Sequence, residues 1–358
     1  MENYNASDTI KLEKPNEWFS NKAVVVSFVL SIFVISIHAN NLSYYGLTDA
    51  SGSLAYQFVK ICADIIGGIA VPFFFTLSGY WFFRMDVSSP DLWKNILHKC
   101  KKKVKTLVIP YLLWNAFGTT FYMIITNIPS LAALMNDGNA IPITLQNILG
   151  GVLLHEYYFT FWYMQDLIVL SFVFVWLLAL CFRFKALIWL ELAGAVIMTI
   201  TGYIFPFMCG SSSLLSFSIG AVLAVYARKF FEMRYSRKLI GICFVLFVVC
   251  CVIRYIDVPK ISGILTCTIC PLLLWVIADL INIKKLRWFY KQSFFIYASH
   301  VIPVTIVGHV LTWVSTGSLW VTFAYIIAVA ATVAIIWMVS KMFNRYLPRF
   351  YSLVCGER

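Results

Sequence analysis

Long apolar runs recur along the whole chain and limit what it can fold into. Each run has about 17 to 25 residues, enough for a helix to cross the roughly 30 Å hydrocarbon core of a bilayer. The sequence therefore predicts an all-α polytopic membrane protein with about ten transmembrane helices. The ten runs lie near residues 23–41, 55–83, 104–126, 161–182, 186–205, 213–229, 239–256, 261–282, 292–312 and 319–343.

The composition leaves no room for a soluble domain of useful size. Apolar residues make up 61% of the 358 residues and charged residues 12%, against about 45–50% and 25% in soluble domains. We therefore expect one membrane domain over residues 23–343, an N-terminal tail over 1–22 and a C-terminal tail over 344–358. No small-residue cleavage site follows the first run, so we expect an uncleaved first helix rather than a signal peptide.

Basic residues alternate from loop to loop, and this alternation predicts the orientation. Of the 28 Lys and Arg residues, all but Lys60, Arg254 and Lys260 fall in the two tails and in alternate loops. This split follows the positive-inside rule, so we predict that both termini lie in the cytoplasm. The formal net charge of +12 then faces anionic lipid headgroups, and we expect no nucleic-acid partner.

The ten cysteines are scattered, mostly within apolar runs, and do not indicate a disulfide framework. Cys267 and Cys270 form a CxxC pair, but no second pair at zinc-site spacing accompanies them. We expect them to serve as small packing residues, and we expect no metal site.

Two ionisable residues lie within the first two runs. His38 is near the far end of the first run and Asp64 is inside the second. Because a charge in the bilayer is costly, such residues mark a functional site by default. His38 would lie about 22 Å along the first helix, in the outer part of the bilayer, where both residues can face one cavity.

Each of these two residues has a functional and a structural interpretation. His38 is a candidate general base or transient acyl carrier, since a neutral imidazole suits either role. It could instead be a packing histidine bonded to a backbone carbonyl. Asp64 is a candidate to orient His38 or to relay protons, or it could cap a broken helix.

Two loops carry candidate binding residues. The longest outer loop, residues 127–160, has no Lys or Arg and runs into the sequence HEYYFTFWYM. Its end supplies His155, Glu156 and Trp162 as candidates to line an acceptor site. The cytoplasmic stretch 91–111 is amphipathic and rich in lysine, which suits anionic headgroups or the phosphates of a nucleotide-bearing donor. Charge alone favours the membrane surface.

Five stretches carry a resemblance to a known family. They are SIHANN at the end of the first run, VPFFFTLSGY at 71–80, KKKVKTLVIPYLLW at 101–114, FWYMQDLIVL at 161–170 and SFFIYASHVIP at 293–303. In this order they resemble the acyltransferase 3 family of bacterial integral membrane acyltransferases. Most members of that family modify exported glycans using a cytoplasmic acyl-CoA.

The resemblance implies a membrane-bound O-acyltransferase of the bacterial cytoplasmic membrane. Its co-substrate would be acyl-CoA, taken as acetyl-CoA, with no bound cofactor, and its acceptor an extracytoplasmic glycan or a lipid-linked sugar. It implies a catalytic role for His38 and donor-side roles for Lys103 and Lys105. For His300 a donor-site role and a helix-packing hydrogen bond both stay open. Membrane lipid is the remaining partner, and the oligomeric state is not predicted.

Two positions depart from the family pattern. The family usually has an arginine eleven positions before the first-helix histidine, where this chain has Ser27, and another in the segment WFLRDL, where this chain has Gln165. Both losses favour an alternative function, a transporter or export component for a surface polysaccharide that keeps the fold without covalent chemistry. A soluble-type Ser-His-Asp enzyme is not supported, because the sequence has no GxSxG elbow.

Overall fold

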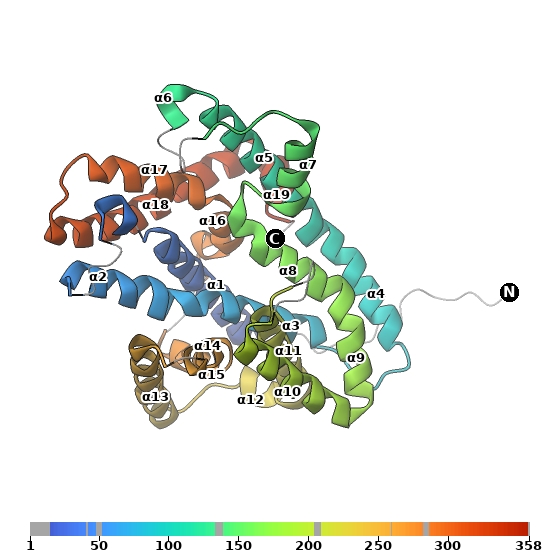
Figure 1. Cartoon of the computed structure of the whole chain (residues 1–358). Helices are drawn as coiled ribbons and strands as arrows, with labels where there is room; N and C mark the ends of the chain where they lie inside the picture. Colours follow the sequence, from blue (N-terminus) through green and yellow to red (C-terminus); the bar gives the residue numbers. More distant parts are fainter. Residues whose placement is uncertain are drawn as a thin grey trace.

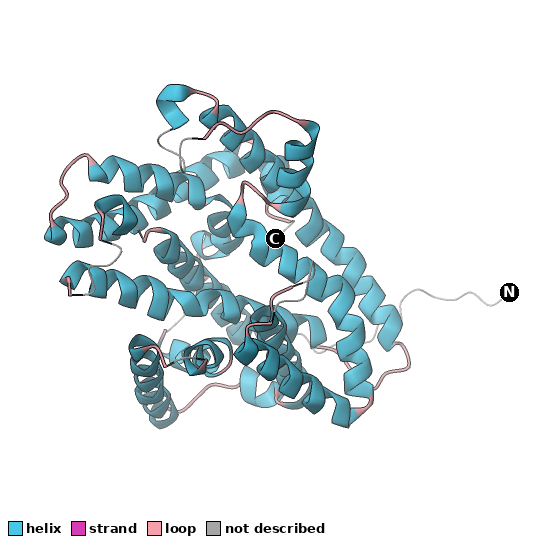
Figure 2. Ribbon diagram, viewed as in Figure 1, coloured by secondary structure: helices cyan, strands magenta, loops and turns pink. Residues whose placement is uncertain are grey.

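The computed structural model describes residues 15–40, 42–47, 52–132, 139–203, 209–258, 260–281 and 286–356. Every regular element within these ranges is helical (Figures 1 and 2). The α-helices are α1 (Glu17–His38), α2 (Leu54–Val59), α3 (Ala70–Phe83), α4 (Leu92–Lys103), α5 (Ile109–Thr126), α6 (Pro129–Ala132), α7 (Leu145–Leu154), α8 (Trp162–Val169), α9 (Val175–Arg183), α10 (Lys185–Thr201), α11 (Ser211–Tyr226), α12 (Arg228–Glu232), α13 (Arg237–Ile256), α14 (Ile261–Cys267), α15 (Ile269–Ile277), α16 (Ser293–Ser299), α17 (Val301–Thr312), α18 (Ser318–Tyr346) and α19 (Pro348–Val354). Short π-helical turns at Lys60–Ile66, Val104–Val108 and Leu170–Phe174, and 3₁₀ turns at Leu42–Tyr45, Gly67–Ile69, Phe159–Phe161, Ala278–Leu280 and Trp288–Gln292, continue or connect these helices.

In the part of the chain that the structure describes, six helical segments are long and apolar enough to cross a bilayer, and two bent helix pairs raise the number to eight if each pair is one span. The two further predicted runs, 186–205 and 213–229, correspond to α10 and α11, which have 17 and 16 residues. A helix of 16 residues is about 24 Å long, which is short of the hydrocarbon core. The all-α membrane fold is confirmed for the described residues, whereas the number of ten crossings stays a prediction.

Helix α1 runs through the middle of the molecule and contacts α3, α16, α17 and α18 (Figure 1). It begins before the predicted boundary at residue 23, because Asn16 caps it. The Asn16 side chain accepts a hydrogen bond of 2.7 Å from the backbone N–H of Phe19. Phe19 and Leu30 are fully buried, so the other helices are assembled around α1.

Helices α3 and α11 cross at very close range. A Cβ on Gly79 would lie 2.0 Å from the carbonyl oxygen of Phe217, and one on Gly220 would lie 1.9 Å from that of Thr76. Each glycine therefore admits the backbone of the other helix, and any larger residue would force the two helices apart.

Two spans are broken close to a proline. Helices α16 and α17 meet at His300 with a bend of 74°, three residues before Pro303, which has no N–H to continue the hydrogen-bond ladder. Helices α14 and α15 bend by 44° before Pro271. The carbonyl of Cys267, which Pro271 leaves without its helical donor, accepts a hydrogen bond of 3.1 Å from the Ser216 hydroxyl.

The second span is also irregular, because the π-helical turn Lys60–Ile66 separates α2 from α3. Arg254, which the charge pattern assigns to the outer side, is buried against this turn. Its guanidinium donates to the carbonyls of Ile65 and Asp64, the latter over 2.9 Å. A buried cation thus satisfies backbone groups that the irregular turn leaves exposed within a span.

Segments that are predicted to share the cytoplasmic side meet at one end of the molecule. There Lys22 pairs with Asp279 over 2.5 Å, and Arg84 pairs with Glu232 over 2.7 Å. The Lys22 ammonium also lies 4.0 Å from the centre of the Trp275 ring. These contacts join the first helix, the loop after α3 and the segments around α12 and α15.

Segments that are predicted to share the outer side meet at the other end. The Tyr44 and His309 rings stack with centroids 4.2 Å apart, and the Ser53 and Ser318 hydroxyls are 3.0 Å apart. Loops that are predicted to lie on the same side of the membrane therefore lie at the same end of the molecule. The assignment of the first end to the cytoplasm stays a prediction.

The predicted C-terminal tail contains a helix that folds back onto the membrane domain. In α19, Tyr351 and Val354 are buried. The Trp114 indole donates to the Val354 carbonyl over 3.0 Å, and the Tyr351 hydroxyl donates to the side chain of Gln292. Residues 348–356 are thus part of the packed structure.

Candidate active site

Two histidines from distant parts of the sequence lie side by side. The ring centroids of His38 and His300 are 4.9 Å apart. Their helices, α1 and α16, run next to each other, and the Ser31 hydroxyl lies 3.0 Å from the Ser293 carbonyl. The histidines follow seven residues later on both helices. The structure therefore joins the predicted catalytic residue, His38, to a residue predicted for the donor side.

The hydrogen bond at His300 determines which ring nitrogen can accept a proton. His300 is fully buried at the bend between α16 and α17, and its Nδ1 lies 2.6 Å from the Tyr297 carbonyl oxygen. A carbonyl only accepts, so Nδ1 carries the proton and Nε2 of the neutral ring has a free lone pair. Within the described part of the chain, Nε2 has no hydrogen-bond partner.

The end of the outer loop holds this histidine pair in place. The buried Tyr158 hydroxyl donates to the Ala298 carbonyl over 2.7 Å, and the Tyr297 hydroxyl donates to the Thr160 carbonyl over 2.7 Å. The Phe159 ring lies 5.5 Å from the His38 ring. The roles of Tyr158 and Phe159 were not predicted, although both belong to the aromatic run that ends the outer loop.

A cavity of about 340 Å³ lies between α1, α3, α8, α16, the end of α4 and the π-helical turn Val104–Val108. It is lined by Ser27, Phe74, Leu77, Ser78, Trp81, Lys103, Thr106, Tyr163, Met164, Leu167, Ser293, Phe294 and Tyr297. Lys103 and Trp81 come from the end of the molecule that is predicted to face the cytoplasm. Lys103 is the one cation among the described lining residues. The cavity is large enough to admit the arm of a substrate.

Two helix faces continue from this cavity to the histidines. Ser27 and His38 are eleven residues apart on α1, which places them on the same face at 100° per residue. Tyr297 and His300 likewise share a face of α16 with Ser293. The histidine pair lies two turns beyond Ser293, on the order of 10 Å along the helix.

The structure separates the two predicted donor-side lysines. Lys103 is half-buried and lines the cavity, whereas Lys105 is exposed and does not line it. Two residues along a helix turn a side chain by roughly 200°, so only one of the two can face the cavity.

The structure does not bring Asp64 to His38. Asp64 is exposed, and its backbone carbonyl rather than its carboxylate accepts the hydrogen bond from Arg254. Among the described residues, the Asp64 carboxylate forms no hydrogen bond or ion pair with His38. Among those same residues, no three His, Cys, Asp or Glu side chains cluster as a metal ion would require.

Within the predicted outer loop, the described residues 139–160 fold back along α5 as a re-entrant segment. Helix α7 packs against α5, and its ten residues span about 15 Å. It ends at His155, whose backbone is left-handed with φ 51°. The Tyr111 hydroxyl donates to the Leu153 carbonyl over 2.8 Å and lies 3.3 Å from His155 Nδ1. Tyr111 is about 22 Å along α5 from Thr126. His155, which contacts Tyr111, is therefore far from the predicted outer end of α5.

The other two predicted acceptor residues lie nearer the surface. Glu156 is exposed, and its carboxylate covers Gly150, where an added Cβ would lie 2.2 Å from Oε2. Trp162 is exposed, and its ring centroid lies 6.4 Å from that of Phe75. Of the three, His155 alone is directed into the protein.

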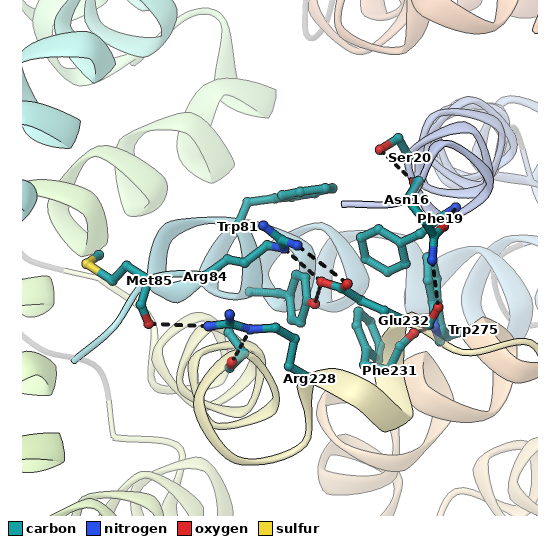
Figure 3. Close-up of polar contacts among 12 residues, drawn as sticks. Asn16, Phe19, Ser20, Trp81, Arg84, Met85, Arg228, Phe231, Glu232 and Trp275 are labelled. Carbon is teal, nitrogen blue, oxygen red and sulfur yellow. Dashed lines mark hydrogen bonds and ion pairs between the residues drawn. The ribbon is translucent and has the colours of Figure 1, made fainter. Parts of the chain in front are cut away.

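A polar network closes the end of the molecule next to the cavity (Figure 3). The Tyr80 hydroxyl and the Arg84 Nε–H both donate to Glu232 Oε1, over 2.5 and 2.7 Å. Burial would raise the pKa of Glu232, but the hydrogen bonds from Arg84 and Tyr80 lower it below its ordinary value. Arg228 donates to the Met85 carbonyl over 3.3 Å. The network fixes α12 to the end of α3, beside the cavity residue Trp81.

The comparison with protein families found one match. The acyltransferase domain model of the acyltransferase 3 family matches residues 28–340, nearly the whole chain. No curated protein and no solved structure matches the chain. The matched range includes both histidines, Lys103 and the re-entrant segment.

Proposed function

We propose a specific reaction for this chain on the premise that it belongs to the acyltransferase 3 family, whose model matches residues 28–340. The protein moves an acyl group, taken as acetyl, from cytoplasmic acyl-CoA to a hydroxyl of an extracytoplasmic glycan or lipid-linked sugar. The observation that carries this proposal is the His38–His300 pair, on the two helices that also line the cavity with Lys103.

The histidine pair supports removal of a proton from the acceptor. His38 is half-buried and therefore the more accessible of the two rings. In the proposed step, His38 takes the hydroxyl proton while the oxygen bonds to the thioester carbonyl carbon. The carbon–sulfur bond then breaks, and the CoA sulfur takes that proton from the His38 imidazolium and leaves as the thiol. A general base in this position contributes on the order of 10² to 10⁴ in rate.

His300 is the positioning residue in this mechanism. Its Nε2 lone pair can accept an N–H from His38 and so stabilise the imidazolium that forms. Two neighbouring imidazoles resist a second proton, because like charges in a buried site repel. The pair therefore takes up one proton at a time, and the bond from Nδ1 to the Tyr297 carbonyl keeps Nε2 free to accept.

Lys103 is the proposed contact for the donor phosphates. A lysine binds phosphate as a point charge, without the bidentate fork of arginine. Ser27, at the position where the family usually has an arginine, lines the same cavity without a charge. Lys103 would therefore provide most of the attraction for the donor in this chain.

The experiment uses sealed membrane vesicles with labelled acetyl-CoA and compares two matched lysine variants. Lys103→Gln should raise KM for acetyl-CoA by about tenfold, the cost of one charge-assisted hydrogen bond. The difference should shrink at high salt, because salt screens the contact. Lys105→Gln should leave KM unchanged. If membranes with and without the protein incorporate equal label, the proposed reaction is wrong, and equal effects of the two variants would exclude Lys103 as the donor contact.

A further inference from the structure

We propose that Tyr111, Asn115, His155 and Gln165 form a binding subsite for an uncharged acceptor that carries hydroxyl groups. Two of these residues come from α5, one from the end of α7 and one from α8. The inference rests on the proposed function and adds the chemical class of the acceptor.

One face of α5 is directed at the re-entrant segment. Tyr111 contacts His155 on this face, and Gly118 and Thr119 continue it. A Cβ on Gly118 would lie 2.6 Å from the Tyr158 ring, and one on Gly151 would lie 2.3 Å from the Thr119 hydroxyl oxygen. Asn115 lies one turn from both Tyr111 and Thr119, so its amide is held between α5 and the segment 151–158.

Polar atoms without partners are concentrated here. Asn115 is 0% exposed, and neither its oxygen nor its nitrogen has a hydrogen-bond partner among the residues that the structure describes. The same holds, within those residues, for the Gln165 side-chain oxygen and the Thr119 hydroxyl. Each buried polar group without a partner costs about 1–3 kcal/mol. Several such groups in one place indicate a ligand that supplies the missing bonds.

The two amides also lie next to the other members of the subsite. Asn115 lies close to the Tyr111 hydroxyl, and Gln165 lies close to His155, but neither pair has the geometry of a well-formed hydrogen bond. The left-handed backbone at His155, uncommon for a residue other than glycine, turns the chain so that the imidazole faces α5. The four side chains therefore form one group from three helical segments.

The charges around the subsite favour a neutral ligand. Residues 127–160 contain no Lys or Arg, and family members usually have an arginine where this chain has Gln165. Glu156 is exposed above Gly150, and Asp166 is occupied by the Ser213 hydroxyl and the Gly210 N–H, over 2.6 and 3.1 Å. Amide and hydroxyl groups both donate and accept, as sugar hydroxyls do, whereas an anion would find no cation here.

The subsite is connected directly to the histidine pair. The chain runs from His155 to Phe159, whose ring contacts His38, and Tyr158 bonds to the residue two positions before His300. An acceptor held by the four side chains would thus lie next to the segment that contacts the pair.

The test uses the purified full chain in proteoliposomes with labelled acetyl-CoA and two defined probes. Methyl glucoside is the neutral probe and methyl glucuronide is the anionic one. Wild type should acylate the glucoside and should leave the glucuronide nearly unlabelled. Asn115→Leu and Gln165→Leu should each raise KM for the glucoside about three- to tenfold, with KM for acetyl-CoA unchanged. The control is Thr332→Val on α18. Like the leucine variants, it removes a buried polar group that has no partner among the described residues, here a hydroxyl, and it should change neither KM.

Two outcomes would overturn the subsite: similar KM values for the two probes, or an unchanged glucoside KM in both leucine variants. Ligand-induced stabilisation separates this inference from the proposed function. Without acetyl-CoA, methyl glucoside should raise the unfolding temperature of wild type and have less effect on either leucine variant. Stabilisation without any acyl transfer would contradict the proposed reaction and support the subsite. Acyl transfer to both probes with similar KM values would support the proposed reaction and contradict the subsite.

Discussion

At the scale of single residues, the two ring nitrogens of His300 have different roles, one structural and one proposed for the reaction. Nδ1 donates to the carbonyl of Tyr297, three residues earlier, where the bend before Pro303 interrupts the helix. Nε2 has no partner within the described ranges, and the His300 ring centroid lies 4.9 Å from that of His38. Different substitutions can remove these two functions one at a time.

Asparagine and glutamine provide that separation. The Asn amide can replace Nδ1–H, and the Gln oxygen can take the place of the Nε2 lone pair. We expect His300→Asn to fold normally and lose about ten- to a hundredfold in kcat, the value of a hydrogen bond to a charged partner. His300→Gln should be less stable but retain more activity. The pH dependence of kcat/KM in each variant provides the second measurement. The reverse order of activities would show that His300 serves only to hold the bend.

The residue-level site was predictable in part. The sequence indicates a role for His38 because an ionisable group in an apolar run marks a functional site by default. It indicates one for His300 because of the motif around that residue. The contact between them was not predictable, since nothing in the sequence sets the register of α1 against α16. Asp64 is a candidate for the same reason as His38, because it is ionisable and lies in an apolar run. The sequence does not reveal that Arg254 binds the Asp64 backbone carbonyl.

At the scale of the helices, the polar network of Figure 3 ties α12 to α3 through one carboxylate. Glu232 accepts from Tyr80 and Arg84, and these bonds hold the Glu232 pKa below its ordinary value. A lowered carboxyl pKa stabilises the fold wherever the group is ionised. That stabilisation is fully present above the unfolded pKa of about 4.3 and is lost as pH falls through the lower folded pKa.

We therefore expect Glu232→Gln to lower the unfolding temperature at pH 7 and to differ less from wild type near pH 3 to 4. The free-energy difference should be about 1 kcal/mol, since solvent screens a partly exposed pair. Thermal unfolding in detergent between pH 3.5 and 7 measures this. Tyr80→Phe keeps the ion pair with Arg84 and should retain the pH dependence with a smaller amplitude. A constant difference between Glu232→Gln and wild type over the whole range would contradict the assignment.

The helices themselves follow from the apolar runs, but the re-entrant segment does not. The run in α7 is ten residues long, too short for a span and equally compatible with a surface helix. Its return along α5 depends on Gly118 and Gly151, which admit Tyr158 and Thr119 at close range. Such contacts between distant positions leave no periodic pattern in the sequence.

At the scale of the whole molecule, the two ends differ in the loops that they gather. The lysine- and arginine-rich segments meet at the end that holds Lys22 and Arg84, and the segments poor in these residues meet at the end that holds Tyr44. The cavity lined by Lys103 lies near the first end, and the re-entrant segment enters from the second. This polarity suits a donor and an acceptor on opposite sides of a membrane.

The orientation can be tested by labelling cysteines in intact cells with a membrane-impermeant reagent. A cysteine at Asn139, which is exposed before α7, should be modified, whereas one at Ser236, which caps α13 in the basic loop, should be protected. Permeabilised cells should label both and so serve as the control. Protection of position 139 together with labelling of position 236 would reverse the topology.

The central claim is that His38 removes the acceptor proton during acyl transfer. The most direct measurement is the acyl content of the surface polymer in cells that express wild type or His38→Gln at matched levels, with polymer export quantified in parallel. Glutamine keeps the size and a hydrogen-bonding amide but cannot take a proton at neutral pH, so acylation should fall by on the order of 10² or more while export is unchanged. Acylation at a rate near wild type would contradict the account, as would loss of export in cells where no acyl group is ever detected.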